Sequence, residues 1–475
     1  MEGRYNKVSP EIAGQLKAIA GDKNVIFGDP AAMEPYAYDS AGKFWGHMPE
    51  AVVKAENADQ ISAIMRLANE KLIPVTPRGA GSGLAAAAVP VFGGISLSME
   101  KMNKILEIDE INMCAVCEPG VVTNDLCQAV EKKGLFYAGY PMSVEESYIG
   151  SNTVCNAGGA KVVKYGSTRH HVLGVEIVTP TGEIITLGGK IRKETSGYSL
   201  LHLLIGSEGT LGVVTKVFLN LIPSPGMTND LLVPFGNMED AVKAASNVVR
   251  KTGVHPVVME FMDIWSVNET IEHLSLPKLP AQEEAEAYLL FTFEGKSEDE
   301  LDDLAEKAGT ACLEMGALDV FVASTKSESE KVWNVRIQMP RVVIEKYPHL
   351  CAGDVVVPVS KVAEFTSKAR AIISKYDGML PIFFGHIGDG NVHPSLADGA
   401  NLGDDEWVEL SEKIQGEISV LGVEMGGAVS GEHGVGVVKM ACLKETSQAH
   451  KIALMKGIKE VFDPNYILNP GKLFE

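Results

Sequence analysis

The segment PRGAGSGLAAAAVP (77–90) follows a strand-like run and carries Gly79, Gly81 and Gly83. Glycines at this spacing let the backbone turn sharply, so that its N–H groups point inward and form a nest for a phosphate or pyrophosphate. The segment is neither G-x-G-x-x-G nor a Walker A loop, and no Walker A sequence occurs in the chain. Taken alone, it is nearly as compatible with a structural turn.

Two more glycine-rich segments lie in the same half of the chain. They are IGSNTVCNAGGAKVVKYGSTRHHVLGVEIV (149–178) and IGSEGTLGVVTKV (205–217). Three such segments indicate a long, curved ligand that lies against the backbone. A flavin dinucleotide fits that description better than a mononucleotide does.

The length and composition favour a globular protein with several domains. A chain of 475 residues exceeds one ordinary core, so we expect two or three domains. The hydrophobic content of 45% and charged content of 22% lie in the globular range. The net charge of −20 argues against a nucleic acid or an anionic membrane surface as partner, because both require clustered Lys and Arg.

The chain start, the apolar runs and the cysteines favour a cytoplasmic protein. The start lacks the apolar core of a signal peptide, and no window approaches 18 uninterrupted apolar residues. The seven cysteines are scattered, which is typical of a reduced protein. Cys114 and Cys117 lie in the strand-like NMCAVCE with no second pair nearby, which indicates buried thiols rather than a metal or iron–sulfur site.

The periodicity of the chain predicts an α+β fold. AVVKA (51–55) reads as a strand, and Asn57 then caps a helix with an apolar stripe. Thr123 opens another helix, and GVEIVTPTGEIITLGG (174–189) reads as a hairpin. A second region begins near IPSPGMTND (222–230), where strands alternate with helices in the ferredoxin-like manner. The last stretch contains one amphipathic helix.

The segment FFGHIGDGNVH (383–393) places two histidines around an Asp-Gly pair. If Asp389 and Gly390 are the central residues of a two-residue hairpin, His386 pairs with His393. Directly paired residues share a face, with Cβ atoms roughly 4.5–5.5 Å apart. Two imidazoles at this separation can share one cation.

The segment GAVSGEHGVG (427–436) offers Glu432 and His433 between glycines. A carboxylate and an imidazole could complete the metal site, or they could cap turns and satisfy buried backbone groups. For either the histidine pair or the Glu-His pair considered separately, the structural role is the commoner one. Their occurrence together, behind three flavin-type segments, favours a functional site.

The quoted motifs together resemble the vanillyl-alcohol oxidase family, which has a PCMH-type FAD-binding domain. With PRGAGSGL, NAGGAKVVKYG, IGSEGTLGVVT, HIGDGNVH, SGEHGVG and the closing LNPGKLF, the chain is similar to one branch of it. That branch holds the glycolate oxidase catalytic subunit and the flavin-dependent D-lactate and D-2-hydroxyglutarate dehydrogenases. The match runs from about residue 45 to the end.

The resemblance implies a division of the chain and a set of flavin contacts. We expect a helical extension over 1–44, a PCMH-type FAD-binding domain over 45–224, a ferredoxin-like cap over 225–425 and a returning C-terminal segment over 426–475. FAD is expected to bind non-covalently, because the 77–84 loop holds no His or Cys. The expected contacts are Arg78, Gly79, Ala80, Gly81, Ser82, Gly83, Leu84, Pro141, Met142, Gly150, Ser151, Asn156, Gly158, Gly159, Tyr165, Gly166, Gly206, Glu208, Gly209, Gly212 and Val214.

The resemblance also implies oxidation of a D-2-hydroxy acid to the 2-oxo acid, with the hydride passing to flavin N5. It makes His386, His393 and Glu432 ligands of one divalent metal, Zn²⁺, Mn²⁺ or Fe²⁺, and His433 the catalytic base. The substrate carboxylate requires a cation, and the family pattern favours Arg336 over Arg341. For either arginine taken alone, a surface ion pair is the commoner explanation.

The chain departs from its relatives around the expected substrate pocket. It reads Pro141-Met142-Ser143 where they usually read Pro-Asp-Pro, and Ala85–Ala88 where they usually place glycines. Cys351-Ala352-Gly353 replaces a segment in which some of them carry a lysine. Flavin binding should survive these changes, whereas the choice of lactate, glycolate or another acid stays open.

The expected partner is an electron acceptor such as an electron-transferring flavoprotein, an iron–sulfur subunit or a quinone. The chain itself has no iron–sulfur motif. Homo-oligomerisation is left open. Two alternatives compete: a flavoprotein electron-relay subunit with a degenerate substrate site, and an alcohol or amine oxidase of the same fold without metal.

Overall fold

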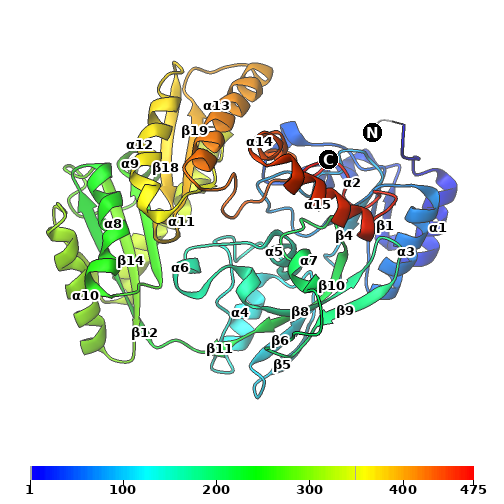
Figure 1. Cartoon of the computed structure of the whole chain (residues 1–475), viewed down its shortest axis with the longest axis horizontal. Helices are drawn as coiled ribbons and strands as arrows, with labels where there is room; N and C mark the ends of the chain where they lie inside the picture. The colour runs from blue at the N-terminus through cyan, green and yellow to red at the C-terminus, as the bar shows by residue number, and fades with distance from the viewer. Residues whose placement is uncertain (1–2, 348) are drawn as a thin grey trace. The chain divides into compact units, whose positions relative to one another are not determined.

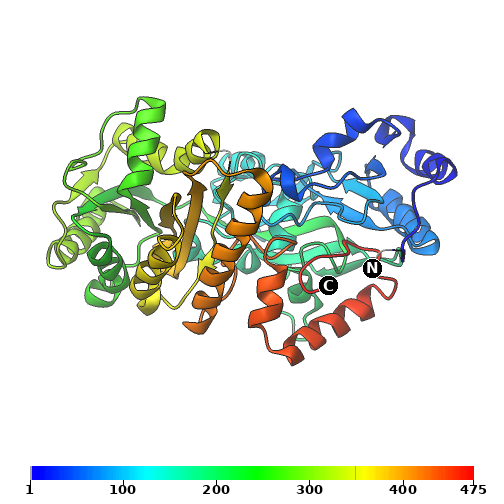
Figure 2. The same ribbon diagram turned by 90° about the horizontal axis from the view of Figure 1, so that it is seen from above.

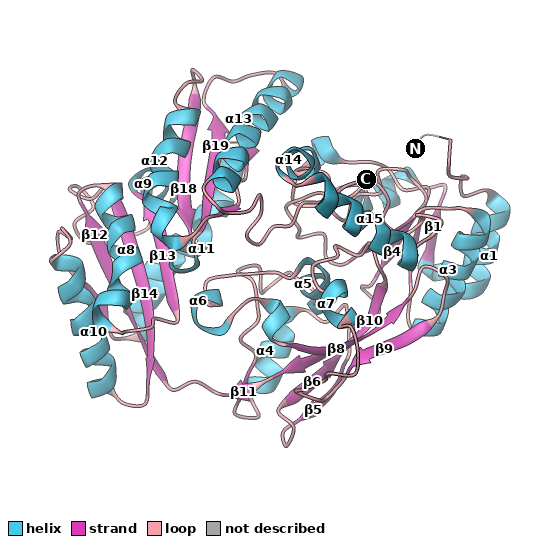
Figure 3. Ribbon diagram, viewed as in Figure 1, coloured by secondary structure: helices cyan, strands magenta, loops and turns pink. Residues whose placement is uncertain are grey.

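The computed structural model describes residues 3–347 and 349–475, which form two compact units. Unit 1 comprises the described part of Met1–Gly158 with Gly166–Ser224 and Glu432–Glu475, and unit 2 comprises Gly159–Tyr165 and Pro225–Gly431. Each unit combines helices and strands, so the predicted α+β class is confirmed (Figure 3).

The division of the chain shares one boundary with the expected one and differs elsewhere. Both place a boundary between residues 224 and 225. The segment before residue 45 is not separate, because α1 (Pro10–Ala20) buries Ala13 and Leu16 in a core of unit 1. The segment 159–165 belongs to unit 2, and the C-terminal segment divides at Gly431 and Glu432.

The first sheet of unit 1 has four strands, in the order β1-β2-β4-β3, and β2, β4 and β3 run parallel. The helix α3 (Ala58–Lys71) connects β2 to β3 and buries Ile61, Ile64 and Met65 in the core. As predicted, the side chain of Asn57 caps α3 by accepting the N–H of Gln60. The strands are β1 (Val25–Phe27), β2 (Ala51–Lys54), β3 (Val75–Arg78) and β4 (Ile95–Ser98).

The second sheet of unit 1 is antiparallel, in the order β5-β6-β10-β8-β9. The predicted hairpin at Thr181-Gly182 is confirmed, because β8 pairs with β9 from Val178 and Ile184 onward. Cys114 and Cys117 are buried in β6, and none of the seven cysteines, all of which are described, forms a disulfide. The strands are β5 (Ile105–Asp109), β6 (Cys114–Cys117), β8 (Val172–Val178), β9 (Ile184–Gly188) and β10 (Val213–Asn220).

Helices of unit 1 pack beside these sheets. The predicted C-terminal amphipathic helix is α15 (Ala449–Phe462), whose buried Lys459 donates to the carbonyl oxygens of Thr210 and Leu468 and to Asp463. The remaining elements of the unit are α2 (Pro30–Met33), α4 (Thr123–Glu131), α5 (Ile149–Cys155), α7 (Leu200–Leu204), α14 (Met440–Thr446), β7 (Leu135–Phe136) and β11 (Ile222–Pro223).

Unit 2 is built on one long sheet, in the order β15-β12-β14-β13-β18-β19-β16, with β17 paired to β19. Its strands β12 to β15 and the helices α8 and α10 follow the β-α-β-β-α-β order of the ferredoxin-like arrangement that the sequence predicts, and α9 is an additional helix between β13 and β14. The strands are β12 (Met227–Phe235), β13 (Val258–Asp263), β14 (Ala287–Gly295), β15 (Phe321–Ala323), β16 (Leu350–Cys351), β17 (Val355–Val356), β18 (Met379–Gly385) and β19 (Asn391–Asp398).

Two cores separate the sheet of unit 2 from helices on both of its faces (Figure 1 and Figure 2). One core receives buried residues of α8, α10, α12 and α13, and the other receives residues of α9 and α11. The helices are α6 (Val162–Tyr165), α8 (Met238–Thr252), α9 (Ile264–Leu274), α10 (Glu298–Leu313), α11 (Lys326–Lys346), α12 (Val362–Ile373) and α13 (Asp404–Glu424). None of the helices described in either unit is long and apolar enough to cross a membrane.

Candidate functional site

Unit 1 contains a cavity whose wall is formed by the glycine-rich segments. Eleven of the residues predicted to contact the flavin line it: Arg78, Gly79, Gly81, Ser82, Gly83, Gly150, Ser151, Glu208, Gly209, Gly212 and Val214. Glycine is required where the chain segments approach most closely. A Cβ atom on Gly150 would lie 2.5 Å from Cβ of Pro119, and Gly81 has a φ of +79°. The wall is therefore mostly backbone, as a dinucleotide-binding site requires.

Arg78 is the cationic side chain in the wall of this cavity, and 7% of it is exposed. One terminal guanidinium nitrogen donates to the carbonyl oxygen of Pro35, at 3.0 Å. The other, Nη1, is buried without a hydrogen-bond partner among the described residues. Burial lowers the pKa of Arg78, which Asp39 partly offsets. A buried guanidinium with an unused donor suits an anionic ligand such as a pyrophosphate.

Sequence reasoning missed Asp39, which also lines the cavity. Burial raises the pKa of Asp39, although its carboxylate accepts the N–H groups of Ala41 and Ala88. Asp39 precedes the first recognised motif by almost forty residues and stands in no motif of its own, so the sequence offers no signal for it.

The other ten predicted flavin contacts do not line this cavity. Asn156 accepts from Ser167 and from the N–H of Arg169, which fixes the turn after α5. In unit 2, the phenol of Tyr165 donates to Glu294, at 2.5 Å. The residues outside the lining are Ala80, Leu84, Pro141, Met142, Asn156, Gly158, Gly159, Tyr165, Gly166 and Gly206.

The histidine turn of unit 2 differs from the predicted two-residue hairpin. β18 ends at Gly385 and β19 begins at Asn391, with a short 3₁₀ turn over Ile387–Asp389 between them. His393 pairs with Phe384, so the predicted pairing of His386 with His393 is wrong. The longer connection arises because Gly390, with a φ of +86°, closes the 3₁₀ turn instead of continuing the ladder.

The predicted proximity of the two imidazoles is nevertheless confirmed. The ring centroids of His386 and His393 are 5.5 Å apart, and a nitrogen of one lies within 4.8 Å of a nitrogen of the other. Both side chains are buried. The connection therefore brings them together by folding back, and not by cross-strand pairing.

Nδ1 of each of the two histidine rings lies within hydrogen-bonding distance of an oxygen outside the pair. Nδ1 of His386 lies 2.5 Å from Oε1 of Glu260, and Nδ1 of His393 lies 3.1 Å from the carbonyl oxygen of Gly353. A carbonyl oxygen and an ionised carboxylate only accept, so each Nδ1 carries the proton. A metal-binding histidine is commonly held in this way, by an outer partner that accepts from the ring nitrogen that does not bind the metal. This donor set fits a divalent metal.

Glu260 joins His386 to Arg336. Nε and Nη2 of Arg336 lie 2.7 and 2.6 Å from Oε2 of Glu260. Burial alone would raise the pKa of Glu260, but the charge of Arg336 and the hydrogen bonds from His386 and Arg336 hold that pKa below its ordinary value. Arg341, in contrast, is exposed and pairs with Glu345 one turn along α11.

Glu260 is a functional candidate that sequence reasoning missed. It is the one charged residue of the apolar run PVVMEFM (256–262), most of which forms the fully buried strand β13. That contrast is a usable signal, because a fully buried carboxylate needs a cation or several donors. The sequence does not reveal which cation, since Arg336 is 76 residues away.

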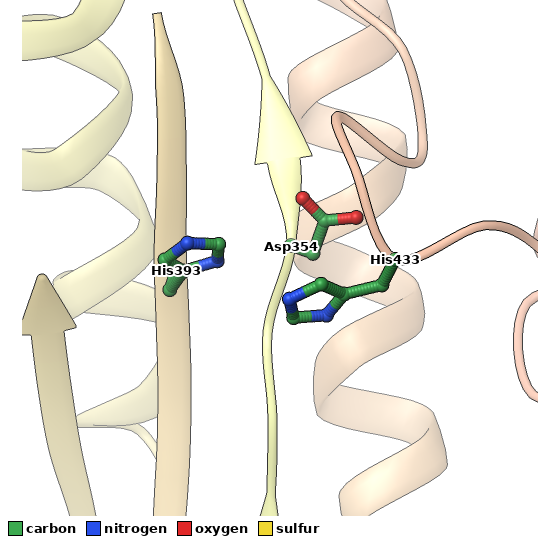
Figure 4. Close-up of side chains that lie close together, drawn as sticks. All are labelled: Asp354, His393 and His433. Carbon is green, nitrogen blue, oxygen red and sulfur yellow. The ribbon is translucent and has the colours of Figure 1, made fainter. Parts of the chain in front are cut away.

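Asp354 is a second buried carboxylate beside the histidine turn. Figure 4 shows it next to His393, and an oxygen of Asp354 lies within 4.8 Å of a ring nitrogen of His393. Asp354 accepts hydrogen bonds from Asn391, Ser430 and the N–H of Gly431, all in unit 2.

Glu432 and His433 are the remaining residues of the predicted site. They follow Gly431 directly and begin the last segment of unit 1. Nε2 of His433 lies 3.6 Å from Oε1 of Glu432.

The chain matches two family descriptions in succession. Residues 49–188 match "FAD binding domain", and residues 225–473 match "FAD linked oxidases, C-terminal domain". Solved structures similar in fold include p-cresol methylhydroxylase with substrate bound, with a TM-score of 0.80 at 18% identity over 100% of this chain and 98% of that one. Another is alkyldihydroxyacetonephosphate synthase, with a TM-score of 0.75 at 19% identity over 98% and 86% of the two chains.

Several curated relatives match over nearly the whole length. The D-lactate dehydrogenase of Anaerostipes hadrus is 39% identical over 475 residues, covering 99% of each chain. The glycolate oxidase subunit GlcD of Bacillus subtilis is 37% identical and covers 98% of this chain and 97% of its own. The D-2-hydroxyglutarate dehydrogenase of Stutzerimonas stutzeri is 32% identical, with 98% and 99% covered. The resemblance inferred from the motifs is thereby confirmed: the chain is an oxidoreductase of the FAD-linked oxidase family, with an FAD-binding domain followed by the C-terminal domain of that family.

Proposed function

We propose that the chain oxidises a D-2-hydroxy acid of the lactate or glycolate type to the 2-oxo acid, using FAD and one divalent metal. The observation that supports this most directly is the buried pair of histidines, His386 and His393, each with its Nδ1 held by an outer acceptor and with nitrogens of the two rings within 4.8 Å of each other. A flavoprotein that only relays electrons has no use for such a pair. Relatives named D-lactate dehydrogenase and glycolate oxidase subunit support the substrate class.

His386, His393 and Glu432 would hold the metal, and two imidazoles with one carboxylate suit Zn²⁺, Mn²⁺ or Fe²⁺. When bound, the metal lowers the pKa of the substrate hydroxyl, and non-covalent FAD takes up the two electrons with the hydrogen from C2. His433 accepts the hydroxyl proton, the role that the family resemblance gives to the histidine after the metal-binding glutamate. Glu260 keeps His386 in the tautomer that the metal requires.

Arg336 is the proposed binder of the substrate carboxylate, with a restriction that the sequence does not reveal. Its Nε and Nη2 already donate to Glu260, so one edge of the guanidinium is committed. The N–H groups on Nη1 remain for the substrate. Glu260 thus holds the plane of the guanidinium while the opposite side binds the acid.

We propose that the electrons leave to a separate acceptor, an electron-transferring flavoprotein, an iron–sulfur subunit or a quinone, in the cytoplasm. Seven cysteines without a disulfide suit a reducing compartment. The competing function is an electron-relay subunit with a degenerate substrate site. The presence of His386, His393, Glu432 and His433 together speaks against degeneration.

The cofactor assignment predicts a specific loss for Arg78→Met. A charge-assisted hydrogen bond contributes about 1.5–3 kcal/mol, so FAD should bind about 10- to 100-fold more weakly. The dissociation constant is measured from the quenching of FAD fluorescence on titration of apoprotein. Arg192→Met, which changes an exposed arginine outside the cavity, should leave this constant unchanged. Equal affinity of the two variants would remove Arg78 from the FAD site.

Anaerobic bleaching of the flavin band tests the function itself. Holoprotein is mixed with D- and L-2-hydroxy acids before chelation, after chelation, and after Zn²⁺, Mn²⁺ or Fe²⁺ is restored. We expect a D-acid to bleach the band, chelation to stop bleaching without releasing FAD, and metal to restore it. If no acid bleaches metal-replete holoprotein although dithionite does, the relay function replaces the proposed one.

A further inference from the structure

Asp354 ties the chain before Glu432 to the histidine turn. The residue is fully buried in unit 2. Its Oδ1 accepts from Nδ2 of Asn391 at 2.7 Å, its Oδ2 accepts from Oγ of Ser430 at 2.6 Å, and the N–H of Gly431 lies 3.1 Å from both oxygens. Asn391 opens β19 two residues before His393. One carboxylate therefore fixes Ser430 and Gly431 to the strand that carries His393.

The close approach of Asn391 to the backbone of Gly431 leaves no space for a side chain at residue 431. A Cβ atom there would lie 1.9 Å from Nδ2 of Asn391. Both oxygens of Asp354 are used, so an asparagine at this position could satisfy only one side of the contact. The NH₂ group of that asparagine would replace one carboxylate oxygen and would face a donor, either Nδ2 of Asn391 or the hydroxyl of Ser430.

Glu208 holds the chain after His433 in the same manner, within unit 1. Its Oε1 accepts the N–H of Val435 and its Oε2 accepts the N–H of Gly436, both at 2.7 Å. Glu208 is buried and has a φ of +52°, a left-handed conformation that a non-glycine residue adopts at a cost. Nδ2 of Asn469 donates to the backbone oxygen of Glu208, which helps to hold this conformation. Glu208 also lines the flavin cavity.

We propose that Asp354 and Glu208 are positioning residues that clamp the two ends of the Glu432–His433 segment. Three residues, Glu432, His433 and Gly434, lie between the anchored Gly431 and Val435. The N–H of Gly431 and the hydroxyl of Ser430 hold the first end through Asp354, and the N–H groups of Val435 and Gly436 hold the second end through Glu208, so only three residues are left between the anchors. The inference rests on the proposed function for the roles of these two side chains. The clamp itself rests only on the hydrogen bonds from Ser430, Gly431, Val435 and Gly436 to the two carboxylates.

The clamp is tested first without substrate. In hydrogen–deuterium exchange on holoprotein, the amides of Gly431, Val435 and Gly436 should be protected. Asp354→Asn should speed exchange at Gly431, and Glu208→Gln should speed it at Val435 and Gly436, each at least tenfold. Asp377→Asn and Glu194→Gln, which change exposed carboxylates in unit 2 and unit 1, are the matched controls and should change none of the three.

The positioning role is tested on the same proteins by metal affinity and by flavin reduction. Asp354→Asn should weaken Mn²⁺ binding at least tenfold, leave the FAD dissociation constant within twofold, and slow anaerobic flavin reduction at saturating Mn²⁺ at least tenfold. Glu208→Gln should slow flavin reduction at least tenfold while dithionite still reduces the flavin fully. If Asp354→Asn fails to fold, Ser430→Ala removes one donor of the clamp and should weaken Mn²⁺ binding at least threefold.

Failure of the clamp and failure of the proposed function give different results. If exchange at all three amides stays at the parent rate in the folded variants, the clamp is refuted. If exchange speeds but Mn²⁺ affinity and flavin reduction match the parent, the positioning role is refuted. If no hydroxy acid reduces the parent flavin while the variants lose Mn²⁺ affinity and amide protection, the proposed function fails and the clamp stands.

Discussion

His433→Ala is expected to slow flavin reduction by the 2-hydroxy acid about 10²- to 10⁴-fold, the range that a positioned general base contributes. The reason is that the substrate hydroxyl must lose its proton as the bond to hydrogen at C2 breaks, and the proposed acceptor of that proton is the His433 imidazole. The rate is measured by stopped-flow absorbance under anaerobic conditions at saturating substrate. FAD should stay bound, because His433 is not among the residues that line the flavin cavity.

Two comparisons separate the loss of a base from general damage. His450→Ala changes an exposed histidine of α15 in the same unit and should reduce its flavin at the parent rate. Mn²⁺ should still bind His433→Ala within a few-fold of the parent, because the proposed ligands are intact. A reduction rate within tenfold of the parent, in protein that retains FAD and Mn²⁺, would show that another group takes the proton.

The parts of the fold that the sequence predicts correctly depend on local patterns. The cap of α3 at Asn57 needs only a side-chain oxygen three residues before a free N–H, and the β8–β9 hairpin needs only alternation around Thr-Gly. The strand and helix alternation of unit 2 is equally local. What periodicity does not reveal is the extension of that sheet by β18, β19 and β16, since β18 joins the sheet by pairing with β13, which is far away in the chain.

The histidine turn shows how a correct conclusion can come from a wrong register. Asp-Gly flanked by apolar residues is a strong signal for a two-residue hairpin, and it led to pairing His386 with His393. In the structure the glycine ends a 3₁₀ turn, and the ladder starts at Phe384 and His393. The rings still approach each other, because His386 stands at the start of the turn and is drawn inward by Glu260.

The buried carboxylates that support the site escape sequence reasoning for a common reason. Glu260, Asp354 and Asp39 each stand alone, outside any recognised motif. Their partners are distant: Glu260 binds residues 76 and 126 positions away, and Asp354 binds Gly431, 77 positions away. A motif identifies the residues that bind the ligand, whereas the residues that hold them in place become visible only when the fold brings distant segments together.

Glu260→Ala is expected to destabilise the protein by about 3–5 kcal/mol, because it leaves the guanidinium of Arg336 buried without a counter-charge. Of the Glu260 and Arg336 side chains, 0% and 3% are exposed, so water cannot replace the carboxylate. The free energy of unfolding is measured by urea denaturation of apoprotein and of holoprotein. A matched control lies on α11, the helix that carries Arg336. Glu345→Ala breaks the exposed pair with Arg341 on that helix and should cost at most about 1 kcal/mol of stability.

The double variant Glu260→Leu/Arg336→Met separates stability from function. Replacing a buried ion pair by apolar residues of similar volume is often neutral or stabilising, so most of the lost stability should return. Metal affinity should not return, because Nδ1 of His386 has lost the acceptor that keeps the proton on that nitrogen and fixes the orientation of the ring. We expect Mn²⁺ to bind this variant about 10- to 100-fold more weakly than the parent, with FAD affinity unchanged. A double variant that is stable and binds Mn²⁺ like the parent would show that Glu260 serves the ion pair alone, and that His386 is held in place by its surroundings.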